Sequence, residues 1–477
     1  PFALGVASGD PTSGGVVLWT RLAPKPLEPF GGMPADMIHV SWVIAEDEQL
    51  TKIVKKGQTL ATPQLGHSVH VEVEGLKPGH PYFYQFRSGE AVSPIGRTRT
   101  MPAGDSLPES FKFAFASCQH YEHGYFTAYQ DMLEQNPDMV IHLGDYIYEY
   151  KGQDKKVRKH LGEEIQSLDD YRIRHSQYRL DTHLNKMHAS CPWLVTWDDH
   201  EFDNNCAGGI SEELNADPVE YLKRRANAYQ AYYEMMPLRR RSLPKGPDMT
   251  LYRTIRCGQL AEFYVLDTRQ YRTDQPNGDR KSPVNDDARR PSNSLLGSQQ
   301  GGWLRSQMLQ SKGIWNVLAQ QVMMGVVNVS RTEEAGYSMD QWPGYFAERE
   351  EIMRFLNTRR VSNPVVLTGD IHSNWVNDLR MDDLNPETPV VATEFVGTSI
   401  SSGGDGSASV PYLDLLKSRN PGVKYHGIQR GYVLCTLTPE VWQSDYRVVE
   451  KVTVENAAVT KNASFVVESG KPGAHQS

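Results

Sequence analysis

The chain of 477 residues lacks several features that would place it in a specialised class of protein. Its five cysteines are few and odd in number, which argues against a disulfide framework. No run of lysine and arginine reaches the density of a nucleic-acid-binding stripe, and the formal net charge is −8. No apolar stretch is long enough to cross a bilayer, and no internal repeat occurs. We therefore expect a globular protein with small-molecule partners.

The chain also has no initiating methionine and no basic, then apolar leader, since it opens at Pro1 with the letters PFAL. Either an export signal has been removed, which predicts a secreted or periplasmic protein, or the chain has been trimmed in another way. At 477 residues it is too long for one small core. We therefore expect two domains, or one large domain with an appendage, in a monomer.

The first part of the chain is rich in strand-like segments and poor in helices. Strand composition is found at residues 15–21, 39–44, 68–73 and 82–87. Leu76, Pro78 and Tyr82 have the spacing of a corner in immunoglobulin-like sandwiches, where a tyrosine hydroxyl bonds back to the backbone. Residues 101–108 read as a Pro/Gly/Ser linker. We predict an all-β immunoglobulin/fibronectin-III-like domain over 1–105 and a second domain over 106–477.

Beyond the linker, strand-like and helix-like segments alternate, which predicts an α/β architecture (α+β in some schemes). Helices are expected at 129–136, 221–236 and 347–356, and a long surface loop at 273–297. Cys257 and Cys435 lie in apolar strand-like runs and are interpreted as buried small hydrophobes. Cys191 and Cys206 could pair across the segment that separates them.

Four short apolar segments that read as strands end in side chains able to bind metal ions. They end at Cys118, at Asp145 with Tyr148, at Asp199 with His200, and at Asp370 with His372. Chemistry in open α/β sheets gathers where strands end, so we expect these side chains to lie close together. Asp145 could bridge two cations, and Tyr148, three residues on, could fold back as a phenolate. Hard and borderline ligands in this pattern are typical of a dinuclear metallohydrolase.

Seven motifs follow one another along nearly the whole chain. They are FALGVASGDP (2–11), ASCQ (116–119), LGDYIYE (143–149), WDDHE with NN (197–201 and 204–205), LDTRQYR (266–272), WPGY (342–345) and TGDIHS (368–373). Together they resemble the alkaline phosphatase D (PhoD-type) family of phosphodiesterases and phosphatases, within the calcineurin-like metallophosphoesterases. The resemblance implies a calcineurin-like four-layer β-sandwich flanked by helices, preceded by the N-terminal domain of that family.

The resemblance also implies a metal centre with Fe³⁺ and one or two Ca²⁺ ions. The implied Fe³⁺ ligands are Cys118, Asp145, Tyr148 and His372, and the Ca²⁺ ligands are the bridging Asp145 with Asp199, Asn204 and Asp370. Thiolate, phenolate and imidazole suit iron, whereas carboxylate and amide oxygens suit calcium. A site for two zinc ions would use more histidine. One candidate for it is His120, which lies two residues after Cys118, where a dinuclear-zinc relative has its histidine.

The implied activity is that of a metal-dependent alkaline phosphatase with phosphodiesterase capacity. It would hydrolyse small-molecule phosphate monoesters or diesters by in-line attack of a metal-bound hydroxide. His200 is the candidate catalytic residue, because it could protonate the leaving oxygen. Arg269 either binds the substrate phosphate with its planar fork or serves as a structural ion-pair partner. The alternatives are a phospholipase-D-like diesterase acting on lipid head groups, a dinuclear zinc hydrolase, and a metal-binding or adhesion module.

Neighbouring residues leave some of these assignments open. Asn205 is nearly as good a ligand candidate as Asn204, and Tyr146 is the alternative to Tyr148. Gln321 stands where the superfamily often has a metal-binding histidine, so its role as a ligand is open. Four further residues are expected to orient their neighbours or to pack rather than to bind: Asp198, Glu201, Trp342 and Tyr345.

Overall fold

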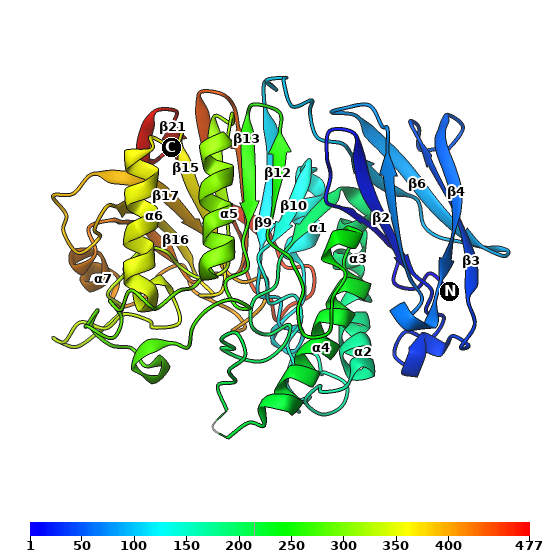
Figure 1. Ribbon diagram of the computed structural model, residues 1–477, viewed down its shortest axis with the longest axis horizontal. Coiled ribbons are helices and arrows are strands. Elements are labelled where there is room, and N and C mark those ends of the chain that lie inside the picture. Colours follow the sequence, from blue (N-terminus) through cyan, green and yellow to red (C-terminus); the bar gives the residue numbers. More distant parts are fainter. Residues whose placement is uncertain (214) are drawn as a thin grey trace.

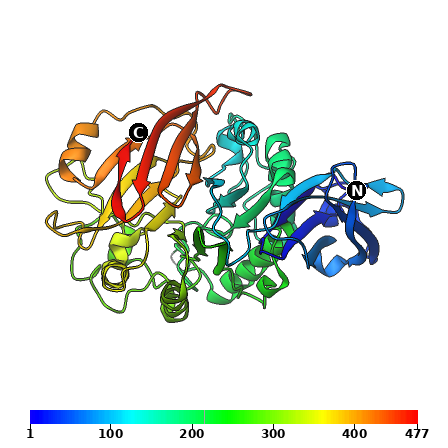
Figure 2. The same ribbon diagram turned by 90° about the horizontal axis from the view of Figure 1, so that it is seen from above.

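The computed structural model describes residues 1–213 and 215–477, and its main body has four layers (Figures 1 and 2). Two large β-sheets pack face to face, and helices cover the outer face of each. A smaller five-stranded sheet belongs to the N-terminal region, at one end of the molecule. This arrangement confirms the predicted mixed α/β sandwich.

The first large sheet contains ten strands, and its centre is parallel. In spatial order the strands are β22 (Lys471–Gln476), β21 (Val459–Glu468), β20 (Val441–Val449), β19 (Gly431–Leu437), β9 (Phe111–Ala116), β10 (Met139–His142), β11 (Pro192–Val195), β1 (Val6–Gly9), β2 (Gly15–Arg21) and β5 (Ser68–Glu74). Strands β9, β10 and β11 run parallel to one another. Their almost uninterrupted apolar sequence follows from burial on both faces.

The second large sheet contains seven strands. In spatial order they are β12 (Arg253–Cys257), β13 (Ala261–Val265), β14 (Trp315–Ala319), β15 (Pro364–Thr368), β17 (Val390–Val396), β16 (Asn374–Arg380) and β18 (Val423–Gly427). Its four central strands β13, β14, β15 and β17 are parallel. The core between the two sheets packs Phe115, Ile141 and Leu194 with Phe263 and Leu367.

Helices close both outer faces of the sandwich. Helices α1 (Ala128–Gln135), α2 (Leu168–Arg179), α3 (Thr182–Ser190) and α4 (Pro218–Met235) pack on the ten-stranded sheet, α5 (Gly297–Gln310) and α6 (Phe346–Thr358) on the seven-stranded sheet, and α7 (Leu413–Arg419) beside β18. Several begin at a side-chain cap: Ser167 forms a capping box with Asp170, and Asp181 and Asp217 cap α3 and α4. The three helices expected from the sequence are therefore α1, α4 and α6.

The N-terminal region is divided between two sheets. Strands β4 (Ile53–Ala61), β3 (Ile38–Ala45), β6 (Pro81–Ser88), β7 (Ala91–Val92) and β8 (Gly96–Arg99) form the small sheet. Strands β1, β2 and β5 instead extend the ten-stranded sheet, where β1 pairs in parallel with β11, Ser8 opposite Pro192. The ten-stranded sheet thus crosses residue 105, and the domain limits 1–105 and 106–477 stay predictions.

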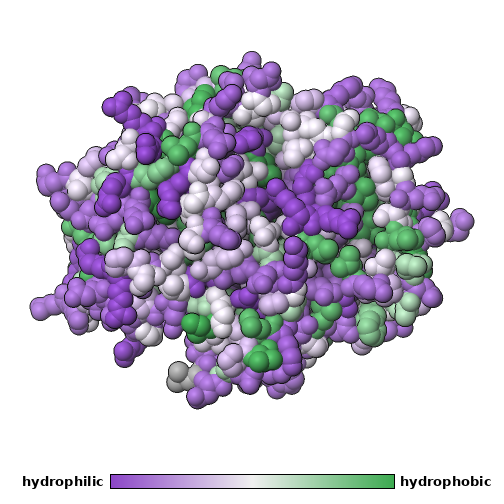
Figure 3. All heavy atoms as spheres, in the orientation of Figure 1, coloured by the Kyte–Doolittle hydropathy of each residue, from purple (hydrophilic) through white to green (hydrophobic). Residues whose placement is uncertain are grey.

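The cysteines and the surface of the protein can be described directly. All five cysteines are buried and free, so Cys191 and Cys206 form no disulfide. None of the helices in the described part of the chain combines the length and apolar character that a membrane crossing needs. The face seen in Figure 3 is mostly hydrophilic, with apolar residues in small groups.

The expected tyrosine corner is present in the N-terminal region. The hydroxyl of Tyr82 accepts a hydrogen bond of 2.9 Å from the backbone N–H of Lys77, and the Tyr82 side chain is fully buried. The bond fixes the turn between β5 and β6 and satisfies a backbone donor that the corner encloses.

Removing this hydroxyl should destabilise the N-terminal region. We expect Tyr82→Phe to lower the free energy of unfolding by about 1–3 kcal/mol, because the Lys77 N–H loses its partner. Denaturant unfolding followed by circular dichroism measures the change. Tyr252→Phe is the control, since Tyr252 is half-buried and its hydroxyl has no hydrogen bond in the described residues. Equal stability of the two variants would contradict the role of the corner.

Candidate metal centre

The predicted ligands meet where strands of both large sheets end, and several of them share an unusual backbone conformation. Cys118 follows β9, Asp145 follows β10, and Asp370 and His372 follow β15. Their φ angles are +59°, +54°, +60° and +53°, the left-handed region that non-glycine residues rarely adopt. Such strain costs of the order of 1–3 kcal/mol per residue and gathers at functional sites. The left-handed turns bend the chain sharply at the strand ends and bring the side chains together.

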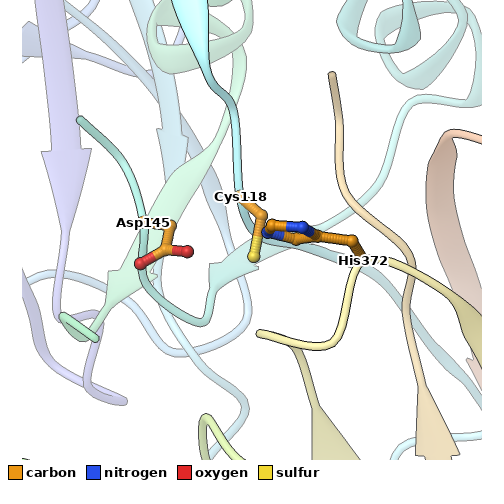
Figure 4. Close-up of side chains that lie close together, drawn as sticks. All are labelled: Cys118, Asp145 and His372. Carbon is orange, nitrogen blue, oxygen red and sulfur yellow. The ribbon is translucent and has the colours of Figure 1, made fainter. Parts of the chain in front are cut away.

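The first group contains Cys118, Asp145 and His372, whose candidate ligand atoms all lie within 4.8 Å of one another. Figure 4 shows the three side chains converging from separate segments, with the sulfur between the carboxylate and the imidazole. The hydroxyl of Tyr148 completes the group, at 2.9 Å from Asp145 Oδ2 and 3.3 Å from His372 Nε2. All four residues predicted to hold one cation therefore lie together.

The second group consists of carboxylates. Oxygens of Asp198, Asp199 and Asp370 lie within 4.8 Å of one another, and so do ligand atoms of Asp145, Asp199 and His200. Asp145 Oδ1, Asp198 Oδ2 and Asp199 Oδ1 are buried and have no hydrogen-bond partner among the described residues. Buried carboxylate oxygens without a partner are costly unless a cation satisfies them. Asp145 lies with Cys118 and His372 on one side and with Asp199 and His200 on the other, as a bridging ligand would.

Burial shifts the pKa values of the candidate ligands. Burial raises the pKa values of the Cys118 thiol, the Tyr148 hydroxyl and the Asp145 carboxyl well above their ordinary values. Burial also raises the pKa of Asp370 to about 6 and lowers the pKa of His372 to about 3. A neutral His372 can donate a lone pair to a cation. The acidic groups need either protons or cations to compensate their burial.

His200 lies against Asp145 and Asp199, and the carboxylates around it favour its protonated form. Its Nδ1 is 2.8 Å from Glu149 Oε2, and its ring stacks on Tyr148 with 4.2 Å between the ring centres. Burial alone would lower the pKa of His200, but the carboxylates of Glu149, Asp199 and Asp145 outweigh it and raise the pKa well above its ordinary value. Because Nδ1 is held by Glu149, the other ring nitrogen is free to deliver a proton.

Arg269 is buried among carboxylates rather than open to the surroundings. Only 1% of its surface is exposed. Its guanidinium bonds Asp198, bonds both oxygens of Asp340 at 2.7 and 2.9 Å, and contacts Asp370 at 3.5 Å. The arrangement matches the ion-pair role that the sequence analysis held open for Arg269. Substrate binding by Arg269 stays a prediction, but each guanidinium nitrogen already has a carboxylate partner.

The two neighbouring asparagines make similar side-chain contacts. The Asn204 amide donates to Glu212, and the Asn205 amide donates to Asp279. Asn205 also lines the groove beside Asp370, and its backbone N–H bonds Asp199 Oδ2 at 2.8 Å. Asn204 therefore stays the predicted ligand, with Asn205 as the alternative.

The other residues whose assignments were open differ in their contacts. Tyr146 points away from the site and bonds His188 Nε2 at 2.9 Å, so Tyr148 is the tyrosine that faces it. Gln321 donates to Thr196 Oγ1 at 2.9 Å and to a backbone carbonyl. His120 stacks against a neighbouring histidine and belongs to none of the metal-ligand groups found in the described residues. Trp342 and Tyr345 are buried in the core over the seven-stranded sheet.

Glu201 performs the orienting role expected of it. Its two carboxylate oxygens accept the backbone N–H groups of Asp145, Tyr146 and Asp198. These bonds tie the turn after β10 to the turn after β11. The strained backbone at Asp145 is thus held by a buried side chain of the adjacent segment, which fixes the carboxylate where both groups need it.

Three residues of the site escaped the sequence analysis. Glu149 holds His200, Asp340 holds Arg269, and Ser402 Oγ lies 2.7 Å from the Tyr148 hydroxyl. Glu149 ends the LGDYIYE motif, so its position beside two ligands was the available signal. Asp340 stands two residues before the WPGY motif, and Ser402 lies in a serine- and glycine-rich stretch that gives no such signal.

An open groove leads to the metal centre. Its volume is about 810 Å³, and Asp370, His372 and Arg430 lie at the end nearest the ligands. Trp375, Tyr412 and other apolar side chains form a wall, and Lys281 and Arg331 also line the groove. The groove is large enough for a phosphate group together with an alcohol of moderate size.

Sheets, helices and site together define a calcineurin-like metallohydrolase, and comparison with known proteins identifies the family. The sequence model of the PhoD-like phosphatase matches residues 113–446, and that of the PhoD-like phosphatase N-terminal domain matches residues 1–102. The chain therefore belongs to the PhoD-like phosphatase family. This confirms the predicted family and enzyme class, a phosphoric ester hydrolase.

Individual relatives agree with the family assignment. The chain is 50% identical over 479 residues to alkaline phosphatase D of Bacillus subtilis (strain 168), an alignment that covers 99% of this chain and 82% of that protein. A solved structure described as "Structure of PhoD" superposes with a TM-score of 0.97 at 49% identity, over 100% of this chain and 92% of that one. Both relatives favour the phosphatase over the phospholipase-D-like alternative.

The carboxylate group should make the metal-free protein sensitive to pH. The pKa of Asp370 is higher in the folded state than in an unfolded chain. Its contribution to stability is therefore present below about pH 4 and is lost as pH rises through about 6. We expect chelator-treated Asp370→Asn to match the wild type near pH 4 and to exceed it by about 1–3 kcal/mol near pH 7.

Thermal unfolding of the chelated proteins across this pH range measures the difference. Asp105→Asn is the control, because Asp105 is exposed and its substitution removes the same formal charge. A stability difference between Asp370→Asn and the wild type that does not change with pH would contradict the prediction.

Proposed function

We propose that the chain hydrolyses phosphate esters of small alcohols at a centre that holds Fe³⁺ and Ca²⁺. The donor set supports this assignment. The thiol, the phenol and the imidazole of Cys118, Tyr148 and His372 suit iron, and the carboxylates of Asp199 and Asp370 suit calcium. The one observation that carries the proposal is that the Cys118 thiol and the Tyr148 hydroxyl both lie close to the carboxylate of Asp145, which also lies close to Asp199. Asn204 is the proposed amide ligand, and the adjacent Asn205 is the alternative.

The residues of the chain would position the ester and move one proton. Cations at such a centre neutralise charge on phosphoryl oxygens and lower the pKa of water. The left-handed turns hold Asp145 between the two ligand groups, and Arg269 keeps Asp198 and Asp370 in place. His200, oriented by Glu149, delivers its proton to the departing alkoxide oxygen. Phosphate monoesters and diesters both fit this chemistry. Export and a monomeric state stay predictions of the sequence.

The metal assignment predicts a coloured protein. We expect elemental analysis of the purified enzyme to find iron and calcium, and a visible band from charge transfer between phenolate and Fe³⁺. Tyr148→Phe should abolish the band, because it removes the phenolate. Tyr146→Phe is the matched control and should keep the band, since the Tyr146 hydroxyl bonds His188 instead. A colourless wild-type protein that contains zinc would overturn the assignment.

The proton-donor role of His200 predicts a dependence on the leaving group. We expect the wild type to hydrolyse both p-nitrophenyl phosphate and an alkyl phosphate. His200→Ala should slow the alkyl ester by about 10²–10⁴-fold and the p-nitrophenyl ester far less, because p-nitrophenolate needs no proton to leave. His39→Ala, at an exposed position on β3, is the control. Equal losses on both esters would contradict proton donation, and absence of turnover by metal-replete wild type would overturn the proposed function.

A further inference from the structure

A cationic side chain that faces the substrate would complete the site, and Arg269 is poorly placed to supply one. A phosphate ester brings negative charge that protein donors normally share with the metal ions. All the Arg269 nitrogens bond carboxylates, and only 1% of the residue is exposed. Arg269 is thus shared among Asp198, Asp340 and Asp370, and another cation of the groove is better placed to meet the substrate.

Arg430 is the arginine at the metal end of the groove. It lines the groove together with Asp370 and His372. Its Nη1 donates to the backbone carbonyl of His372, and its Nε donates to the carbonyl of Gly404 at 2.8 Å. Two of its nitrogens are therefore tethered to the backbone, one of them at a predicted metal ligand. The tethers fix the guanidinium plane beside the centre.

The third nitrogen of Arg430 is free to bind a ligand. Nη2 has no hydrogen-bond partner among the described residues. It is not one of the buried side-chain nitrogens that lack a partner, so it is accessible from the groove. Gly403 lies directly against it: a Cβ atom on this glycine, at φ +88°, would stand 2.7 Å from Nη2. The missing side chain keeps the space beside Nη2 open. A donor that is held by its neighbours and left unpaired at the mouth of a site is preorganised for an anion.

Resting on the proposed function, we propose that Arg430 binds a non-bridging oxygen of the substrate phosphate through Nη2. The other cations of the groove, Lys281 and Arg331, are exposed, and Arg331 stacks on Tyr412 at 4.0 Å from the ring centre. They lack the backbone tethers to His372 and Gly404 that fix Arg430. Arg430 is therefore the specific phosphate contact, and Lys281 and Arg331 serve as comparison cations without that contact.

The test compares Arg430→Gln and Arg430→Lys with Lys281→Gln and Arg331→Gln. The probes are p-nitrophenyl phosphate as substrate and inorganic phosphate as inhibitor. We expect Arg430→Gln to lower kcat/KM and to weaken phosphate inhibition, each by about 10²-fold, while metal content and the visible band stay unchanged. Arg430→Lys, which keeps a charge near the site, should recover about 10-fold of the loss. Lys281→Gln and Arg331→Gln should stay within about threefold of the wild type.

Two results would overturn the proposal. One is phosphate inhibition of Arg430→Gln within threefold of the wild type. The other is loss of metal in Arg430→Gln, which would show that Arg430 serves only to hold the His372 segment. If Arg430→Gln does not fold, unchanged phosphate inhibition of Arg430→Lys overturns it instead. Failure of the proposed function is distinguishable, because it would abolish turnover in the wild type and in every variant alike.

Discussion

Negative charge is buried where the two large sheets meet, and the structure depends on its compensation. Asp145, Asp198, Asp199 and Asp370 converge there, and Arg269 is the cation that bonds several of them directly. One guanidinium cannot neutralise four carboxylates in a medium of low dielectric constant, and three of their oxygens have no partner among the described residues. Protons or bound cations have to compensate the charge that Arg269 leaves. The packing of the two sheets and the chemistry of the site therefore depend on the same carboxylates.

Convergence of the ligands is a property of the packing between the sheets. Cys118 and Asp145 follow strands of the ten-stranded sheet, whereas Asp370 and His372 follow a strand of the seven-stranded sheet. The apolar core between the sheets sets their separation, so its side chains determine whether thiol, carboxylate and imidazole reach one point. The left-handed turns at the strand ends direct the ligand side chains toward that point. Glu201 holds one of these turns by accepting three backbone N–H groups. Precision at the site therefore comes from rigid strand ends rather than from long loops.

Much of this site could be predicted because metal binding selects distinctive residue types at strand ends. Cys118, Asp145, Tyr148 and His372 stand out after apolar runs, and their convergence follows from the rule that strand ends face one edge. Side-chain direction within a loop follows no such rule. Asn204 and Asn205 are chemically identical, and each donates its amide to a nearby carboxylate, Glu212 or Asp279. The role of Arg269 was equally open, because a sequence does not show that its guanidinium is enclosed by carboxylates. The sequence also did not show which sheet each strand joins. Strands β1, β2 and β5 look like strands of a separate domain, yet they extend the ten-stranded sheet.

That continuity has a consequence for how the chain folds during synthesis. Strand β1 ends at Gly9, and its parallel partner β11 is complete only at Val195, so the first strands leave the ribosome long before their neighbour exists. The N-terminal strands share an apolar core, but one edge of β1 remains open until the chain has grown past β11. Pairing across so large a sequence separation is slow, and an open strand edge invites association with other chains. A ribosome that stalls before β11 would thus release a fragment prone to aggregation. The open edge of β1 is covered only when β11, and with it the metal-binding part of the chain, is in place.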